Sequence, residues 1–170
     1  MTWERILKNC RKYDCYPTIE TFFSTCPPLI RNYLTLQTIP AGQLLIQAGA
    51  PCGTVYILVS GRLQAIEEKA GEIPYSFFDL SPFDIVGDYE LFSEDAESYV
   101  TVRAWEPSAC LTIPPVFYLQ WLSTDSTALF FRTRLLMKKL SLQLNSSRRY
   151  LLMSYGQRCM YVISQEAGKV

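Results

Sequence analysis

The sequence predicts a mainly β protein with flanking helices, in which an antiparallel β sandwich or barrel is followed by a long helix. Between residues 34 and 114, seven or eight short apolar runs recur at roughly ten-residue spacing, separated by Gly and Pro. After residue 126 an apolar pattern of helical period continues to about residue 155 without Gly or Pro. With 49% hydrophobic, 14% aromatic and 19% charged residues, the composition excludes disordered, collagenous and coiled-coil-only chains.

The first 35 residues predict a helical segment, because apolar residues recur at helical spacing from Trp3 to Cys10 and Pro28 opens a further short helix. Residues 36–118 then form the predicted β domain. Short apolar runs alternating with turn residues favour antiparallel strands over a parallel α/β sheet. The expected strands lie within residues 34–39, 44–49, 54–61, 62–68, 74–80, 84–92, 99–105 and 109–114.

Residues 119–155 predict a short helix around Trp121 and a long one from Thr127 to about Tyr155. A helix of about 29 residues extends roughly 43 Å, which is longer than a small sandwich is wide. Part of the apolar face of this helix therefore needs another partner, most simply the same helix of a second subunit. The alternative is that the apolar face packs only on the sheet. The expected homodimer interface consists of alternating a and d residues: Phe130, Thr133, Met137, Leu140, Leu144, Ser147 and Leu151.

The charges divide the chain into two parts. Residues 1–125 hold 8 Lys or Arg against 15 Asp or Glu, net −7, whereas residues 126–170 hold 8 against 1, net +7. A basic tail on an acidic body indicates either a polyanionic partner or attraction between the two parts. The ordinary explanation for the basic residues of the long helix is a solvated helix face. The more specific alternative is that Arg148 and Arg149 contact nucleic-acid phosphates.

The chain contains no histidine, which excludes Ser-His and Cys-His nucleophiles and His-ligated zinc, iron or haem. The sequence contains no apolar run of 18 residues, the length needed to span a bilayer, and no signal peptide is evident. We therefore expect a cytoplasmic protein with no membrane partner. Six cysteines without a C-x-x-C pair then default to buried or idle thiols.

Four glycines in order, Gly42, Gly49, Gly61 and Gly87, carry a resemblance to a known family. Residues 49–61, residues 83–92 and the Val-Arg-Ala of residues 102–104 fit the same pattern. Over roughly residues 30–155, the chain resembles the cyclic-nucleotide-binding fold of the Crp/Fnr family of bacterial transcription regulators. The resemblance implies a double-stranded β-helix, or jelly roll, followed by a long dimerisation helix.

The resemblance also implies an effector site. In the family, the segment matching Gly87 to Tyr99 binds a cyclic phosphate through helix N–H groups and an Arg, and a Glu takes the ribose hydroxyl. Here Asp88 stands for that Glu, Glu90 for Ala or Gly, Ser98 for the Arg, and Tyr99 for Ser or Thr. We therefore expect that cAMP and cGMP are not ligands. The expected lining of a small-molecule effector site, without metal or cofactor, is Gly87, Asp88, Tyr89, Glu90, Leu91, Ser98, Tyr99 and Gln143.

Other sensing modes stay open at this stage, since Cys10, Cys15, Cys26 and Cys110 resemble the iron–sulfur members in number, though with loose spacing, and could alternatively form a thiol switch. In the family, a winged helix-turn-helix that follows the long helix binds DNA. Residues 156–170 resemble the start of such a domain, most of which lies outside this sequence.

The first interpretation is the effector-sensing and dimerisation domain of a DNA-binding regulator, and not an enzyme. The alternative is a stand-alone sensor or interaction module that acts on a protein partner. A cupin-like enzyme is the third class, and its usual His-rich metal site is absent from this sequence.

Overall fold

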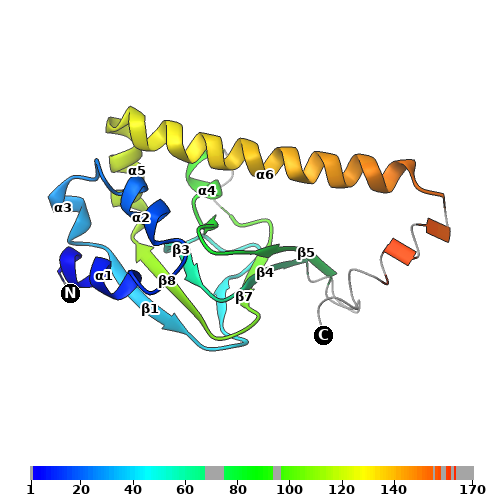
Figure 1. Ribbon diagram of the computed structural model, residues 1–170, viewed down its shortest axis with the longest axis horizontal. Coiled ribbons are helices and arrows are strands. Elements are labelled where there is room, and N and C mark those ends of the chain that lie inside the picture. The colour runs from blue at the N-terminus through cyan, green and yellow to red at the C-terminus, as the bar shows by residue number, and fades with distance from the viewer. Residues whose placement is uncertain are drawn as a thin grey trace. The chain divides into compact units, whose positions relative to one another are not determined.

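The computed structural model describes residues 2–67, 75–93, 97–154, 156–157, 160–161 and 163. The chain divides into two compact units, Met1–Leu129 and Phe130–Val170. The first unit contains two four-stranded antiparallel sheets, in the orders β1-β8-β3-β6 and β2-β7-β4-β5. Figure 1 labels β1, β8 and β3 of the first sheet and β7, β4 and β5 of the second. The predicted fold class, a jelly roll with flanking helices and a long C-terminal helix, is confirmed. The strands are β1 (Thr35–Ile39), β2 (Leu44–Ile46), β3 (Val55–Ser60), β4 (Leu63–Glu67), β5 (Tyr75–Leu80), β6 (Ile85–Val86), β7 (Thr101–Ala104) and β8 (Ser108–Ile113).

The core of the roll is built from apolar side chains of both sheets. β8 lies between β1 and β3, where Leu111 pairs with Leu36 on one side and with Ile57 on the other. β8 has a strand on each edge, and all six of its residues are buried. Nine buried residues form the central cluster: Ile39, Ile46, Leu58, Leu63, Ala65, Leu80, Val102, Ala104 and Cys110.

Helices at both ends of the first unit share an aromatic cluster. The ring of Phe23 stacks on Trp121 at 5.1 Å between centroids, and Phe22 contacts both Trp121 and Phe83. Trp121 and Tyr118 are fully buried, so this cluster fixes the last helix of the unit to the first ones. These helices are α1 (Trp3–Cys10), α2 (Tyr16–Phe22), α3 (Pro28–Arg31) and α5 (Pro115–Thr124).

The long helix α6 (Ser126–Leu152) begins at a well-defined cap. Asp125 accepts hydrogen bonds from the backbone N–H groups of Thr127 and Ala128, at 3.0 and 3.1 Å. Burial raises the pKa of Asp125, but the hydrogen bonds from Thr25, the helix N–H groups and Trp121 outweigh it and lower the pKa. The sequence predicted this helix about one residue too late at its start.

Two boundaries differ from the sequence prediction. The run 84–92 was expected to be one strand, but β6 ends at Val86 and a short helix, α4 (Tyr89–Phe92), follows. Gly87 separates them because its φ of +81° takes the chain out of the extended conformation. The short helix before α6 begins at Pro115, which occupies the first helical turn, rather than at residue 119. Within the described residues, no helix is long and apolar enough to cross a membrane.

Candidate functional site

Gly87 forms the floor of the predicted site, between β6 and α4. A Cβ atom at this position would lie 2.5 Å from the carbonyl oxygen of Thr54 and 2.6 Å from Sγ of Cys52. Together with the positive φ, these contacts require glycine here. The thiol of Cys52 in turn donates to the Thr54 carbonyl at 3.1 Å. The loop before β3 therefore fills the space directly against the glycine.

Asp88 turns towards the α5 side of the roll. It is buried, and its Oδ2 accepts a hydrogen bond of 3.0 Å from the hydroxyl of Tyr118, which is itself fully buried. Its backbone carbonyl accepts from the N–H of Leu91, which closes the first turn of α4. Asp88 thus links the loop after β6 to α5, and sequence reasoning did not identify Tyr118 as its partner because 30 residues separate the two.

Ser98 is buried and takes part in three hydrogen bonds within the roll. Its N–H donates to the carbonyl of Ala50 at 3.1 Å, and its carbonyl accepts from the N–H of Gly49 at 2.8 Å. Its hydroxyl donates to the carbonyl of Val100 at 3.0 Å. The hydroxyl proton is therefore used inside the protein, which leaves Ser98 without a donor for a ligand anion.

Glu90 places a carboxylate near Cys52. Its Oε2 atom is buried and has no hydrogen-bond partner within the part of the chain that the structure describes. Burial raises the pKa of the Cys52 thiol, the hydrogen bond to Thr54 opposes this, and the charges of Glu90 and Asp88 raise it further. The field at this side of the glycine is therefore negative. Sequence reasoning did not select Cys52, although it lies within the glycine-bounded run 49–61.

Two tyrosines form the exposed rim of the site. The rings of Tyr89 and Tyr99 meet edge to face, with centroids 5.9 Å apart and planes at 71°. Both side chains remain more than half exposed, at 62% and 58%. Leu91 is half-buried, and Phe92 beside it is exposed. We call Gly87–Phe92, Ser98 and Tyr99, together with Cys52, the cradle.

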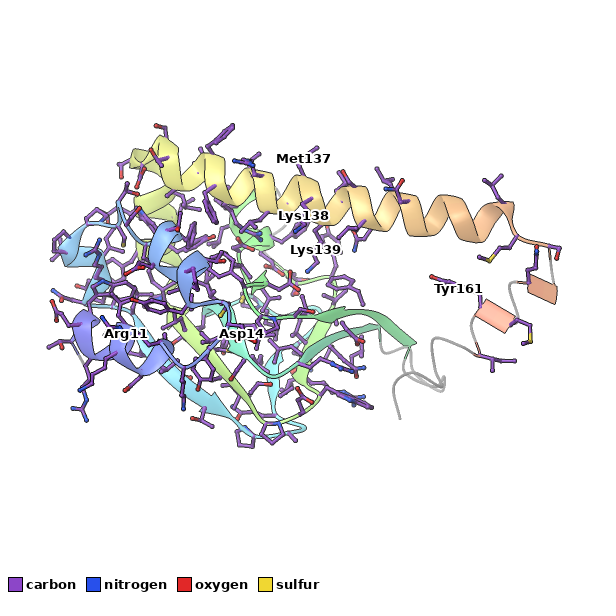
Figure 2. The ribbon with its side chains drawn as sticks, viewed as in Figure 1. Arg11, Asp14, Met137, Lys138, Lys139 and Tyr161 are labelled. Atoms are coloured by element: carbon purple, nitrogen blue, oxygen red, sulfur yellow. The ribbon has the colours of Figure 1, made fainter. Side chains whose placement is uncertain are left out.

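The remaining predicted residues lie on α6, in the second unit from Phe130 onwards. Gln143 is exposed there. Met137 and Lys139 project from opposite sides of α6 (Figure 2). The side chains of Ser147 and Leu151 lie outside the described residues, as do those of Arg148 and Arg149. The other five predicted interface residues are all exposed: Phe130, Thr133, Met137, Leu140 and Leu144.

Four cysteines outside the cradle are buried thiols among the described residues: Cys10, Cys15, Cys26 and Cys110. Burial raises the pKa of Cys10 and Cys26 to about 11 and that of Cys110 to about 12. Cys15 donates its thiol hydrogen to the carbonyl of Val59 at 3.1 Å. Among the described residues, no three or more His, Cys, Asp or Glu side chains are placed to hold a metal ion.

This geometry agrees with a comparison with known protein families. The model of the cyclic nucleotide-binding domain matches residues 36–125, which is just over half of the chain. The chain belongs to the cyclic nucleotide-binding domain family. No curated protein sequence is similar enough to count as a match.

Solved structures of this family share the fold. The c-di-GMP-responsive global regulator CLP of Xanthomonas campestris is 21% identical, with a TM-score of 0.67 over 87% of this chain and 70% of that one. A Crp/Fnr-family transcriptional regulator from Eubacterium rectale is 17% identical, with a TM-score of 0.66 over 82% of this chain and 65% of that one. A mutant of a cAMP-binding acyltransferase from Mycobacterium smegmatis is 27% identical, with a TM-score of 0.51 over 62% of this chain and 34% of that one. The domain thus resembles regulatory cyclic nucleotide-binding domains, which occur in transcription regulators and also in an enzyme.

Proposed function

We propose that this chain is the effector-sensing and dimerisation domain of a Crp/Fnr-type transcription regulator, and that its effector is not a cyclic nucleotide. The family and the fold of the similar regulators support the first part of this proposal. The hydrogen bonding of Ser98 supports the second and carries the argument most directly. The domain itself performs no catalysis in this proposal, and it acts in the cytoplasm.

A cyclic phosphate is an anion and needs donors or a cation. At the Arg position of the family, this chain has Ser98, whose hydroxyl already donates to Val100. Loss of a charge-assisted hydrogen bond costs about 1.5–3 kcal/mol, which corresponds to roughly a ten- to hundredfold loss of affinity. Glu90 adds a negative charge on α4, the short helix that follows Gly87, and would repel the phosphate further.

Calorimetric titration of the 170-residue protein with cAMP and cGMP tests the effector proposal. We expect no heat of binding up to about 1 mM nucleotide. The matched variant Ser98→Arg with Glu90→Ala restores the cation and removes the anion, and we expect it to bind cAMP at least about tenfold more tightly than the parent protein. A low-micromolar dissociation constant for cAMP with the unmodified protein would refute the proposal.

We propose that two subunits dimerise through the row of apolar a and d residues on α6. Phe130, Met137, Leu140 and Leu144 are 45–66% exposed at a and d spacing, and such a stripe on a helix of about 40 Å is typical of a coiled-coil seam. In this proposal, effector binding to the roll would alter the dimer formed by α6 and so the position of the DNA-binding segments.

The oligomeric state tests the stripe. Sedimentation velocity is expected to show a dimer, and Leu140→Asp is expected to shift it to monomer by raising the dissociation constant at least about a hundredfold, because a buried seam cannot accept an unpaired carboxylate. Leu142→Asp is the matched control, since Leu142 is 60% exposed on another side of the helix. Equal effects of the two variants would contradict the proposed seam.

DNA contact is proposed for the segment that starts at Gly156, with the basic residues of α6 as solvated surface. A sensor module that acts on a protein partner is the second candidate, because one of the similar structures is a cAMP-binding acyltransferase and not a transcription regulator. DNA-binding assays on the intact gene product separate the two: specific duplex binding supports the regulator, and its absence supports the protein-partner module.

A further inference from the structure

The end of β7 places an arginine and a tryptophan on the outer face of the second sheet. Val102 and Ala104 belong to the central cluster of the core. Because side chains alternate along a strand, Arg103 lies on the opposite face, and Trp105, two residues further on, follows it there. Trp105 is 43% exposed, as this position requires.

Arg62 joins these two side chains from the neighbouring strand. Leu63, the first residue of β4, is a core residue that pairs with Ala104, so Arg62 just before it belongs to the outer face. The N–H of Trp105 donates to the carbonyl of Arg62 at 2.9 Å, which places the two residues opposite each other. Arg103 is then a diagonal neighbour of Arg62, and such neighbours lie about 7–8 Å apart.

The two guanidinium groups are not neutralised by the part of the chain that the structure describes. Neither group forms a hydrogen bond or an ion pair with a described residue, and the N–H that Arg62 donates to Ser108 belongs to its backbone. Gln64 lies between Arg103 and Asp79 in the sheet and donates its side-chain N–H to the carboxylate of Asp79 at 3.1 Å. Both arginines therefore keep their donors for a partner.

An apolar side chain extends this surface beyond Trp105. Leu44 of the edge strand β2 pairs with Arg103 and is 50% exposed. Trp and Arg are the residue types that contribute most to binding at protein interfaces, and they act best when apolar surface surrounds them. We call Leu44, Arg62, Arg103 and Trp105 the Trp105 patch.

The charges around the patch indicate an anionic partner of limited size. Residues 32–125 hold 12 acidic residues and three basic ones, which are Arg62, Arg103 and Lys69, and Lys69 lies outside the described residues. An acidic body repels a long polyanion such as a nucleic acid, which needs several phosphate contacts. Two guanidiniums instead fit one or two carboxylates.

We propose that the Trp105 patch binds an acidic segment of a partner protein. Its carboxylates bind Arg62 and Arg103, and an apolar side chain packs on Trp105 and Leu44. Residues on one face of an extended segment recur about every 6.6 Å, close to the separation of the two arginines, so the segment alternates acidic, apolar and acidic residues at every second position. This inference goes beyond the proposed function, since the patch shares no residue with the cradle.

Three heptapeptides test the proposal. The first is acetyl-Ser-Asp-Ser-Leu-Ser-Asp-Ser-amide, and the other two carry Asn or Lys in place of both Asp residues. Titration of the 15N-labelled protein follows the indole N–H of Trp105. We expect a dissociation constant of about 1 mM or below for the Asp peptide, at least about tenfold weaker binding of the Asn peptide, and no shift with the Lys peptide. The indole of Trp121 should stay unchanged, because it is buried and donates to Asp125 at 3.0 Å.

Variants then separate charge from apolar contact. Arg103→Gln and Arg62→Gln should each weaken the Asp peptide about three- to tenfold, and Leu44→Ala about threefold. Glu106→Gln should strengthen it about twofold, because this exposed acid follows Trp105 in the turn and repels the peptide. Arg5→Gln is the matched control, an exposed arginine on α1, and should change nothing. Thermal unfolding shows that each variant stays folded.

Four outcomes would overturn the proposal. They are no Trp105 shift with the Asp peptide up to about 10 mM, equal affinity for the Asp and Asn peptides, equal losses with Arg5→Gln and Arg103→Gln, and a Trp105 shift by oligothymidylate at lower concentration than by the Asp peptide. The last outcome would assign the patch to nucleic acid. None of the four bears on the cyclic-nucleotide titration, which tests the proposed function separately.

Discussion

The chain turns through a left-handed glycine at two closely packed corners of the roll, Gly61 and Gly87, and the two corners use their polar groups differently. At Gly61 the hydroxyl of Ser108 accepts from the N–H of Arg62 at 3.1 Å and donates to the carbonyl of Glu106 at 2.8 Å. At Gly87 the neighbouring Glu90 keeps a buried oxygen without a donor within the described residues. The polar groups of the first corner are satisfied within the fold, whereas the second corner keeps an unsatisfied carboxylate oxygen among the described residues.

The two corners also differ in which atoms a side chain in place of the glycine would meet. A Cβ at Gly61 would meet the side-chain Oγ of Ser108 and would also lie 2.7 Å from two backbone atoms, the carbonyl oxygen of Pro107 and Cα of Ser108. A Cβ at Gly87 would meet one backbone oxygen and the end of the Cys52 side chain. Two of the three nearest atoms are backbone at Gly61, whereas only one is backbone at Gly87, so more of the Gly87 corner can be repacked.

The largest expected effect comes from Gly61→Ala. Positive φ costs about 1–2 kcal/mol for alanine, and the clash with backbone adds about 1–3 kcal/mol, so the free energy of unfolding should fall by about 3 kcal/mol. Gly42→Ala is the matched control: Gly42 has a φ of +79° but no atom near its Cβ position, so only the backbone cost should appear. Urea unfolding measures both variants.

The same series sharpens the contrast with the cradle. Gly87→Ala should destabilise nearly as much as Gly61→Ala, but adding Cys52→Ala should recover about 1 kcal/mol, because the sulfur contact disappears and only the Thr54 carbonyl remains. If Cys52→Ala brought no recovery, the sulfur would not be what fills the cradle floor.

The next effect in size is that of Tyr118→Phe. The Tyr118 hydroxyl donates to the buried carboxyl group of Asp88, and hydrogen bonds of this kind contribute about 1.5–3 kcal/mol. The loss should lower the free energy of unfolding by that amount, again in urea. Tyr33→Phe serves as control, since Tyr33 is partly exposed and stacks on Phe117 through its ring. An equal effect of both variants would mean that Asp88 gains nothing from Tyr118.

The frame of the fold could be predicted from the sequence, because it depends on local periodicity and on glycines at turns. Ile57 and Leu111, for example, lie in apolar runs that become the central strands β3 and β8. The cradle could be predicted only in outline. The position of Ser98 was visible, but its hydrogen bonds to Ala50 and Val100, and the partner of Asp88 on α5, depend on tertiary packing between distant segments. The helical turn after Gly87 was interpreted as strand, since a four-residue helix is too short to show a period.

The smallest effect tests whether the negative field at Gly87 is real. Besides burial, the charges of Glu90 and Asp88 hold the pKa of the Cys52 thiol above its ordinary value. Glu90→Gln removes one of these charges, so the pKa of Cys52 should fall and more thiolate should be present at about pH 8. We expect Cys52 to react with iodoacetamide about two- to threefold faster in the variant, measured by mass spectrometry of its peptide. Cys110, whose pKa burial alone raises to about 12, should keep its slow rate in both proteins and reports any general loosening of the fold. An unchanged rate for Cys52 would show that the charge of Glu90 does not affect the pKa of the Cys52 thiol.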